Sequence, residues 1–238
     1  MEKKINSAFL FIIGILSILF FYIPILNDKF QYIKSNSINE IEISRILFCQ
    51  FTHYDFKHLF INVFIFEILG FSIVKKNING LLLLLISNIL FIPFMIYFFN
   101  EDIFYYRGLS GIVNSMFVLF FISLLLDATD DIKTKIISIL LLGLFFVKIS
   151  YEIFYKKSVV ILNYEVVSTA HITGIFIALG VVLFYRKRKR RLTSSCPSCL
   201  RHGRVAVIRS ASGRGQDVSV RCNPMLAQER NKNNNRRS

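Results

Sequence analysis

The sequence predicts an all-α membrane protein with six transmembrane helices. Of its 238 residues, 54% are hydrophobic and only 18% are charged, whereas soluble domains average about 25% charged residues. Apolar runs recur along the chain and leave no long amphipathic stretch from which a separate soluble core could form. The function is therefore expected inside the bilayer.

The individual helices follow from the length that a membrane requires. About 20 apolar residues cross about 30 Å of hydrocarbon, which places six spans at 7–26, 56–74, 80–99, 109–126, 133–149 and 168–185. The first span begins with basic residues, but Tyr22 to Leu26 offers no small-residue cleavage site, so we expect an uncleaved helix. The second span contains polar residues that must face protein. The fifth is short and ends at Lys148.

Basic residues predict the orientation of the six helices. With six spans, most flanking Lys and Arg residues fall on one side of the membrane, and that side is expected to be cytoplasmic. They are Lys3, Lys4, Lys75, Lys76, Lys133, Lys135 and the run 186–191. We therefore expect a multi-pass protein of a bacterial inner membrane with both termini in the cytoplasm. The even-numbered helices then all begin at the outer face.

The composition changes near residue 192, which separates a membrane domain at 1–191 from a tail at 192–238. The tail has eight Arg and one Lys against two acidic residues, and we expect it to be disordered or not native to this protein. A zinc site is the alternative for Cys196, Cys199, His202 and Cys222, although their spacing is irregular. Because the tail and the topology account for the net charge of +14, nucleic acid is not an expected partner.

Polar residues in spanning segments are costly and therefore suggest function. They cluster where the second, fourth and sixth spans begin. His58 and Asn62 are four residues apart and share one helix face. Because all even-numbered helices begin at the outer face, these clusters reach a similar depth and can converge. The converging side chains are His58, Asn62, Ser110 and His171.

These residue types suit nucleophilic catalysis. Ser110 lies at a helix N-terminus, where the backbone N–H groups from Leu109 onward favour a developing negative charge. His58 and Asn62 carry side-chain donors that can complete this oxyanion site. His171 can take the serine proton and return it to the leaving amine. The sequence shows no carboxylate that could serve as a third catalytic group, so we predict a Ser–His dyad without metal or cofactor.

Small residues support the same prediction. Gly108 lets the chain enter the membrane plane before the fourth helix starts. Gly111 in that helix, and Gly174 with Ala178 in the sixth, allow the two helices to approach closely. A hydrogen bond between a serine and a histidine requires that approach.

Taken together, these motifs resemble the rhomboid family of intramembrane serine proteases over about residues 50–180. The pattern comprises His53, His58 and Asn62, then Gly108-Leu109-Ser110-Gly111, then Ala170-His171 followed by Gly174. The resemblance implies a six-helix core, a transmembrane protein as substrate, Ser110 as nucleophile, His171 as base, and His58 and Asn62 near the oxyanion. The compact core and the Gly-Leu-Ser-Gly sequence also resemble the rhombosortase branch, which processes C-terminal anchor signals.

The chain departs from the family at three points. It has no Trp, so the Trp-Arg element of the first outer loop is missing, and Ala178 replaces a second glycine. Asn114 stands where many members have an aromatic residue that supports the histidine. We expect Asn114 to hydrogen-bond His171 instead, because it faces the same side as Ser110. His53 precedes its helix and either supports the site or simply bonds a loop.

Two other functions compete with proteolysis. A rhomboid-like protein that only binds membrane proteins would need a damaged dyad, whereas both Ser110 and His171 are present. A small transporter would place its polar residues along a path through the bilayer, whereas these gather near one face. The sequence therefore favours a peptidase whose partners are a transmembrane substrate and lipids.

Overall fold

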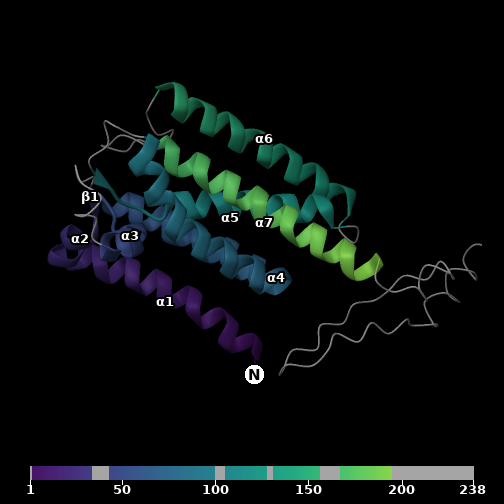
Figure 1. The fold of residues 1–238 in the computed structure, drawn as a ribbon, viewed down its shortest axis with the longest axis horizontal. Coiled ribbons are helices and arrows are strands. Elements are labelled where there is room, and N and C mark those ends of the chain that lie inside the picture. The colour runs from purple at the N-terminus through teal and green to yellow at the C-terminus, as the bar shows by residue number, and fades with distance from the viewer. Residues whose placement is uncertain (1, 34–42, 100–104, 128–130, 156–166, 195–238) are drawn as a thin grey trace, which may run out of the picture. The chain divides into compact units, whose positions relative to one another are not determined.

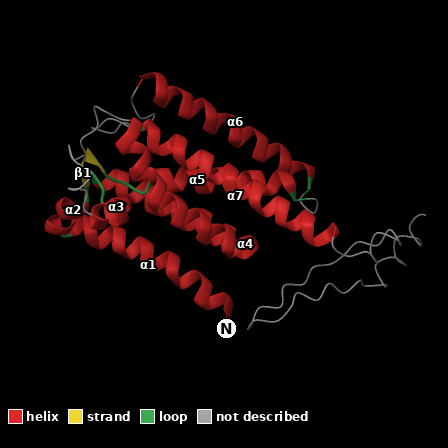
Figure 2. Cartoon of the chain, in the orientation of Figure 1, coloured by secondary structure: helices red, strands yellow, loops and turns green. Residues whose placement is uncertain are grey.

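The computed structural model describes residues 2–33, 43–99, 105–127, 131–155 and 167–194. These residues are mostly helical, with one short antiparallel pair of strands (Figure 2). The chain divides into a unit at Met1–Leu183 and a second at Phe184–Ser238, of which the end of one helix is described. The predicted tail lies outside the described residues beyond Ser194, and so does the alternative zinc site.

Five long helices dominate the described residues. They are α1 (Glu2–Tyr22), α4 (Phe56–Phe99), α5 (Ser110–Leu126), α6 (Ile132–Tyr155) and α7 (Ser168–Ser194). The shorter elements are α2 (Pro24–Phe30), β1 (Tyr32–Ile33), α3 (Ile43–Phe48), the 3-10 helix η2 (Cys49–Phe51) and β2 (Tyr105–Tyr106). In Figure 1, α1 packs on α4, α4 packs on α5, and α5 packs on α6.

Several of these helices are long and apolar enough to cross a membrane. Within the described residues they are Phe56–Phe99, Ile132–Tyr155 and Ser168–Arg188. A fourth is obtained if Ala8–Tyr22 and Pro24–Phe30 count as one bent span, and Ser110–Leu126 is a shorter apolar helix. The set is consistent with a multi-pass membrane protein.

The helix α4 is broken and folds back on itself. Asn77 has a non-helical backbone (φ −157°, ψ 83°), and its Oδ1 accepts a hydrogen bond from Gly80 N at 2.9 Å, as a helix-capping residue does. His58 in the first half lies against Gly108, and Asn88 in the second half donates to Ser115 Oγ. A straight helix would hold His58 and Asn88 about 45 Å apart, which those two contacts do not allow. The break falls between the segments predicted at 56–74 and 80–99.

Two of the helices end elsewhere than the predicted spans in ways that affect the site or the membrane arrangement. The first helix ends at Tyr22 and a second begins at Pro24 after a bend of 106°, because a proline disfavours the helical conformation of the preceding residue. Ile23 accordingly has an extended backbone (φ −107°, ψ 93°). The helix predicted to end at residue 149 continues as α6 to Tyr155. This extension brings Glu152 into a helix.

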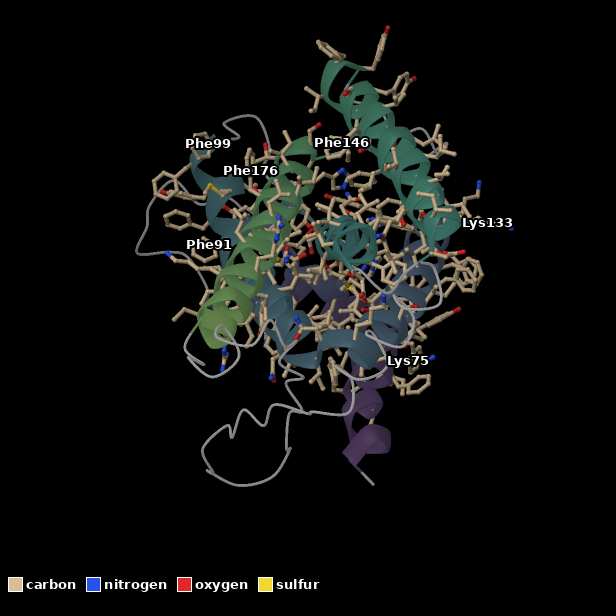
Figure 3. All side chains as sticks on the ribbon, turned by 90° about the vertical axis from the view of Figure 1, so that its right-hand side faces the viewer. Lys75, Phe91, Phe99, Lys133, Phe146 and Phe176 are labelled. Atoms are coloured by element: carbon tan, nitrogen blue, oxygen red, sulfur yellow. The ribbon has the colours of Figure 1, made fainter. Side chains whose placement is uncertain are left out.

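The outward faces of the helices are apolar. Phe91 and Phe99 of α4 and Phe176 of α7, labelled in Figure 3, line one open groove, and their exposed fractions are 49%, 73% and 69%. Soluble proteins rarely expose large contiguous apolar surfaces. Such faces suit contact with lipid chains.

Candidate active site

Ser110 and His171 meet where α5 and α7 begin. Ser110 is the first residue of α5, and His171 lies in the first turn of α7. The Nε2 atom of His171 is 3.0 Å from Ser110 Oγ, which is a hydrogen-bonding distance. Two residues 61 positions apart in the sequence are thus in direct contact.

Small residues make this contact possible. A Cβ atom at Gly174 would overlap the carbonyl oxygen of Gly111, and a Cβ at Gly111 would lie 3.1 Å from the carbonyl oxygen of Ala170. Ala178 is fully buried on α7. The backbones of α5 and α7 therefore touch, and any larger residue at Gly174 would force them apart.

The second ring nitrogen of His171 contacts a carboxylate. Its Nδ1 atom lies 2.9 Å from Glu152 Oε2, and Glu152 is only 2% exposed. An ionised carboxylate can only accept a hydrogen bond, so beside an ionised Glu152 the proton of a neutral ring would lie on Nδ1. In the neutral ring Nε2 then bears a lone pair and can accept the hydroxyl proton of Ser110. The ring thus lies between the Glu152 carboxylate on one edge and the Ser110 hydroxyl on the other.

Glu152 is the neighbour of His171 that the sequence prediction did not include. Lys148 ends the apolar stretch of the fifth span, so Glu152 seemed to belong to a loop. In the structure, Lys148 Nζ lies 3.1 Å from Glu152 Oε1, one helical turn away. Because the two charges neutralise each other, the helix can continue past both. The i,i+4 spacing of Lys148 and Glu152, with the apolar Ile149 and Ile153 beside them, is the sequence signal that identifies this extension.

Asn114 does not support His171 in the predicted way. Both ring nitrogens of His171 are already engaged, one by Glu152 and one by Ser110. Asn114 is buried, and its amide nitrogen has no hydrogen-bond partner among the described residues. The prediction failed because the carboxylate comes from α6, where the sequence showed a loop.

His58 and Asn62 lie on the buried face of α4 next to the loop before Ser110. The Asp55 carboxylate caps this helix by accepting the backbone N–H of His58 at 2.7 Å. A Cβ atom at Gly108 would lie 2.5 Å from Cε1 of His58, so the imidazole packs directly on the Gly108 backbone. Gly108 has a φ of 124°, which L side chains rarely adopt. Asn62 is buried one turn further along, and its amide nitrogen finds no acceptor within the described part of the chain.

The beginning of α5 offers further donors. Leu109 occupies the N-cap position, is fully buried, and makes no side-chain capping bond. The first backbone N–H groups of a helix have no intrahelical acceptor. The start of α5 therefore places backbone N–H groups without an intrahelical acceptor beside Ser110.

His53 is buried between η2 and α4. Burial, and secondarily the neighbouring His58, lower the pKa of His53 well below its ordinary value of 6.5, so this imidazole is neutral. Its Nδ1 atom lies 3.1 Å from the carbonyl oxygen of Phe51, and its ring meets that of His58 edge to face at 5.0 Å. His53 thus packs behind His58. Among the described residues, no hydrogen bond joins His53 to Ser110 or His171.

The loop before Ser110 is fastened to the residues that follow α1. Tyr106 pairs with Tyr32 in the short sheet, and its hydroxyl lies 2.9 Å from the carbonyl oxygen of Gly108. Arg107 donates to Gln31 Oε1 at 2.7 Å and to Asp28 Oδ1 at 2.7 Å. These contacts hold the loop in a chain that lacks the Trp-Arg element.

Exposure distinguishes Ser110 from the groups around it. Ser110 is partly exposed, whereas His171, Glu152, His58 and Asn62 are buried. Of these residues, Ser110 is therefore the one with part of its surface open to a ligand. In the described ranges, no group of three or more His, Cys, Asp or Glu residues is arranged to hold a metal ion.

The described residues thus form apolar helices in which a serine and a histidine from two helices are in contact. Residues 40–188 match the family model of the rhomboid domain, which is more than half of the chain. The protein belongs to the rhomboid family, whose members are typically intramembrane serine peptidases. No curated protein matches the chain.

Proposed function

We propose that this protein is an intramembrane serine endopeptidase with Ser110 as nucleophile and His171 as general base. The observation that carries the proposal is the distance of 3.0 Å between His171 Nε2 and Ser110 Oγ. A nucleophile and a base within hydrogen-bond reach, with the base held by a third group, is the signature of activated serines. The family match over residues 40–188 supports the same activity.

The proposed membrane arrangement has six spans and places this site near the outer face. The spans are α1, the two halves of α4, α5, α6 and α7. The salt bridge at 3.6 Å between Lys76 Nζ and Asp127 Oδ2 joins the break in α4 to the end of α5. These two turns thus lie on the same side, and the basic residues near them, Lys75 and Lys133 among them (Figure 3), favour the cytoplasm. Ser110 and His171 start their helices on the opposite side.

The reaction begins when a peptide carbonyl approaches Ser110. The Oγ–H proton passes to His171 Nε2 while Oγ bonds to the carbonyl carbon, and the C=O pair moves onto oxygen. When the tetrahedral intermediate collapses, the C–N bond breaks and the leaving amine takes the proton from Nε2. An acyl-serine remains. Water then loses a proton to His171 and attacks the acyl carbon, and collapse releases the carboxylic acid as Ser110 regains its proton.

The negative oxygen of each intermediate requires donors placed in advance. The N–H groups at the start of α5, from Leu109 onward, lie beside Ser110, and the N-cap side chain of Leu109 does not cap them. His58 and Asn62 approach from the neighbouring helix α4, where His58 packs on Gly108. One such donor is worth about 3–4 kcal/mol of transition-state stabilisation in a soluble protease. We assign these groups to the oxyanion site.

The proposed substrate is a membrane-anchored protein whose anchor helix unwinds locally. A peptide bond within a helix is shielded by its own hydrogen bonds, so small or helix-breaking residues are expected at the cleaved bond. The alternative is the rhombosortase type, in which the cleaved segment belongs to a C-terminal anchor signal.

Cleavage in proteoliposomes tests this function. The full chain is reconstituted with two single-span proteins, one with a Gly-rich helix beginning at the outer face and one with a C-terminal anchor signal. We expect at least one to be cut near the outer end of its anchor, with no product from the Ser110→Ala variant. The more rapidly cut substrate decides between the two specificities. Equal cleavage by wild type and Ser110→Ala would sink the proposal.

A further inference from the structure

The carboxylate of Glu152 is a buried ionisable group that a Ser–His dyad does not require. It comes from α6, a third helix, and reaches the edge of the His171 ring opposite to Ser110. We propose that Glu152 is the positioning residue of a Ser110–His171–Glu152 triad. This inference rests on the proposed function and assigns a role within the same site.

The surroundings of Glu152 keep its carboxylate charged. A carboxylate that is 2% exposed is costly unless it is paired and hydrogen-bonded. Lys148 Nζ lies 3.1 Å from Oε1 and 3.2 Å from Oε2, and His171 Nδ1 lies 2.9 Å from Oε2. Both oxygens are thus engaged. The side chain of Lys148 is 34% exposed, so this ion pair lies at the edge of the bundle on the Lys148 side.

A charged Glu152 would act through the imidazole. It accepts the Nδ1–H hydrogen bond, which fixes the ring and leaves the lone pair on Nε2 facing Ser110. When Nε2 takes the serine proton, the carboxylate faces the resulting imidazolium and stabilises it. Glu152 itself stays ionised throughout, since the proton leaves again from Nε2 to the departing amine.

A purely structural role is the competing explanation. Glu152 also joins α6 to α7 through its backbone, because Ser168 Oγ donates to the Glu152 carbonyl oxygen at 3.2 Å. If the side chain only connected the two helices, any hydrogen-bonding group of the same size would serve. A triad instead needs an acceptor. The amide of Gln can donate a hydrogen bond to Nδ1, which favours the tautomer with its proton on Nε2. The same substitution of an amide for the triad carboxylate has this effect in a soluble protease.

The order of activities among Glu152 variants separates the two roles. We would measure kcat and KM for cleavage of a single-span substrate by the full chain carrying Glu152→Gln, Glu152→Ala or Glu152→Asp. We expect Gln and Ala to lower kcat by about 10²- to 10⁴-fold with KM nearly unchanged, with Gln no better than Ala. Asp keeps the charge and should restore at least part of kcat. The control Ser168→Ala removes the backbone contact alone and should stay within about threefold of wild type.

The opposite order would overturn the inference. If Glu152→Gln retains nearly full kcat while Glu152→Ala loses it, the side chain is only a connection between helices. A second readout needs no substrate: the ¹⁵N chemical shifts of His171, assigned by comparison with His171→Gln. We expect a protonated Nδ1 in the wild type and a loss of that preference in Glu152→Gln; unchanged shifts would contradict the triad.

The two proposals fail in different ways. If the wild type cleaves and Ser110→Ala does not, but all Glu152 variants match the wild type, only the triad is wrong. If the wild type cleaves nothing, the peptidase function is wrong, and the His171 shifts still decide whether Glu152 sets the tautomer.

Discussion

Replacing Ser110 or His171 with Ala is expected to lower kcat for peptide-bond cleavage by about 10⁴- to 10⁶-fold, the loss that follows when a member of a serine protease's catalytic group is removed. Either change removes one side of the 3.0 Å contact between Nε2 and Oγ. Because the two residues act as a unit, the double variant should be no slower than the single variants. Initial rates of product formation in detergent or liposomes provide the measurement.

Ser123→Ala is the matched control for this prediction. Ser123 lies on the same helix α5. Its hydroxyl donates a hydrogen bond to the carbonyl oxygen of Phe120, three residues earlier. Its replacement should leave the rate within about threefold of wild type. Additive losses in the Ser110 and His171 double variant would show that the residues act separately, against the proposed mechanism.

Replacing Gly174 with Ala should abolish most activity without touching a reacting group. The added Cβ would overlap the carbonyl oxygen of Gly111, so α7 must move away from α5 and the contact between His171 and Ser110 lengthens. We expect at least a 100-fold loss of kcat/KM, since small displacements of catalytic groups can cost that much. Overpacking should also destabilise the fold by about 1–3 kcal/mol, measurable as a lower Tm.

Gly180→Ala on the same helix is the control. No heavy atom lies within 4 Å of the position that its Cβ would occupy, so this substitution adds a methyl group without a clash. Activity should be retained, and the fold should gain up to about 1 kcal/mol from the better helix propensity of Ala. Similar behaviour of the Gly174 and Gly180 variants would show that the close approach of α5 and α7 is not needed for activity.

The sequence alone predicted the pairing of Ser110 with His171 because topology constrains it. Residues at the starts of even-numbered helices lie at a similar depth. Glycines let two of these helices approach closely, and neither feature depends on the conformation of the loops. The break in α4 was predictable for a related reason: polar Lys75, Lys76 and Asn77 interrupt a run of apolar residues that is too long for one span.

The features that could not be predicted depend on contacts between distant helices. Hydropathy places Glu152 in a loop because each charged residue lowers the predicted tendency to span the membrane. It takes no account of the salt bridge by which Lys148 compensates this charge. The predicted bond from Asn114 to His171 relies on Asn114 facing the same side of its helix as Ser110, whereas Glu152 of α6 occupies Nδ1 of the ring and Ser110 occupies Nε2. Pro24 marked the end of α1, yet the apolar residues around it concealed the bend.

Covalent labelling with a fluorophosphonate probe tests the central claim most directly, because the probe reacts only with an activated serine. The full chain in detergent is treated with the probe, digested and mapped by mass spectrometry. We expect a single phosphonyl adduct on Ser110, absent in Ser110→Ala and strongly reduced in His171→Ala. A folded wild type that stays unlabelled, or an adduct that persists in Ser110→Ala, would contradict it.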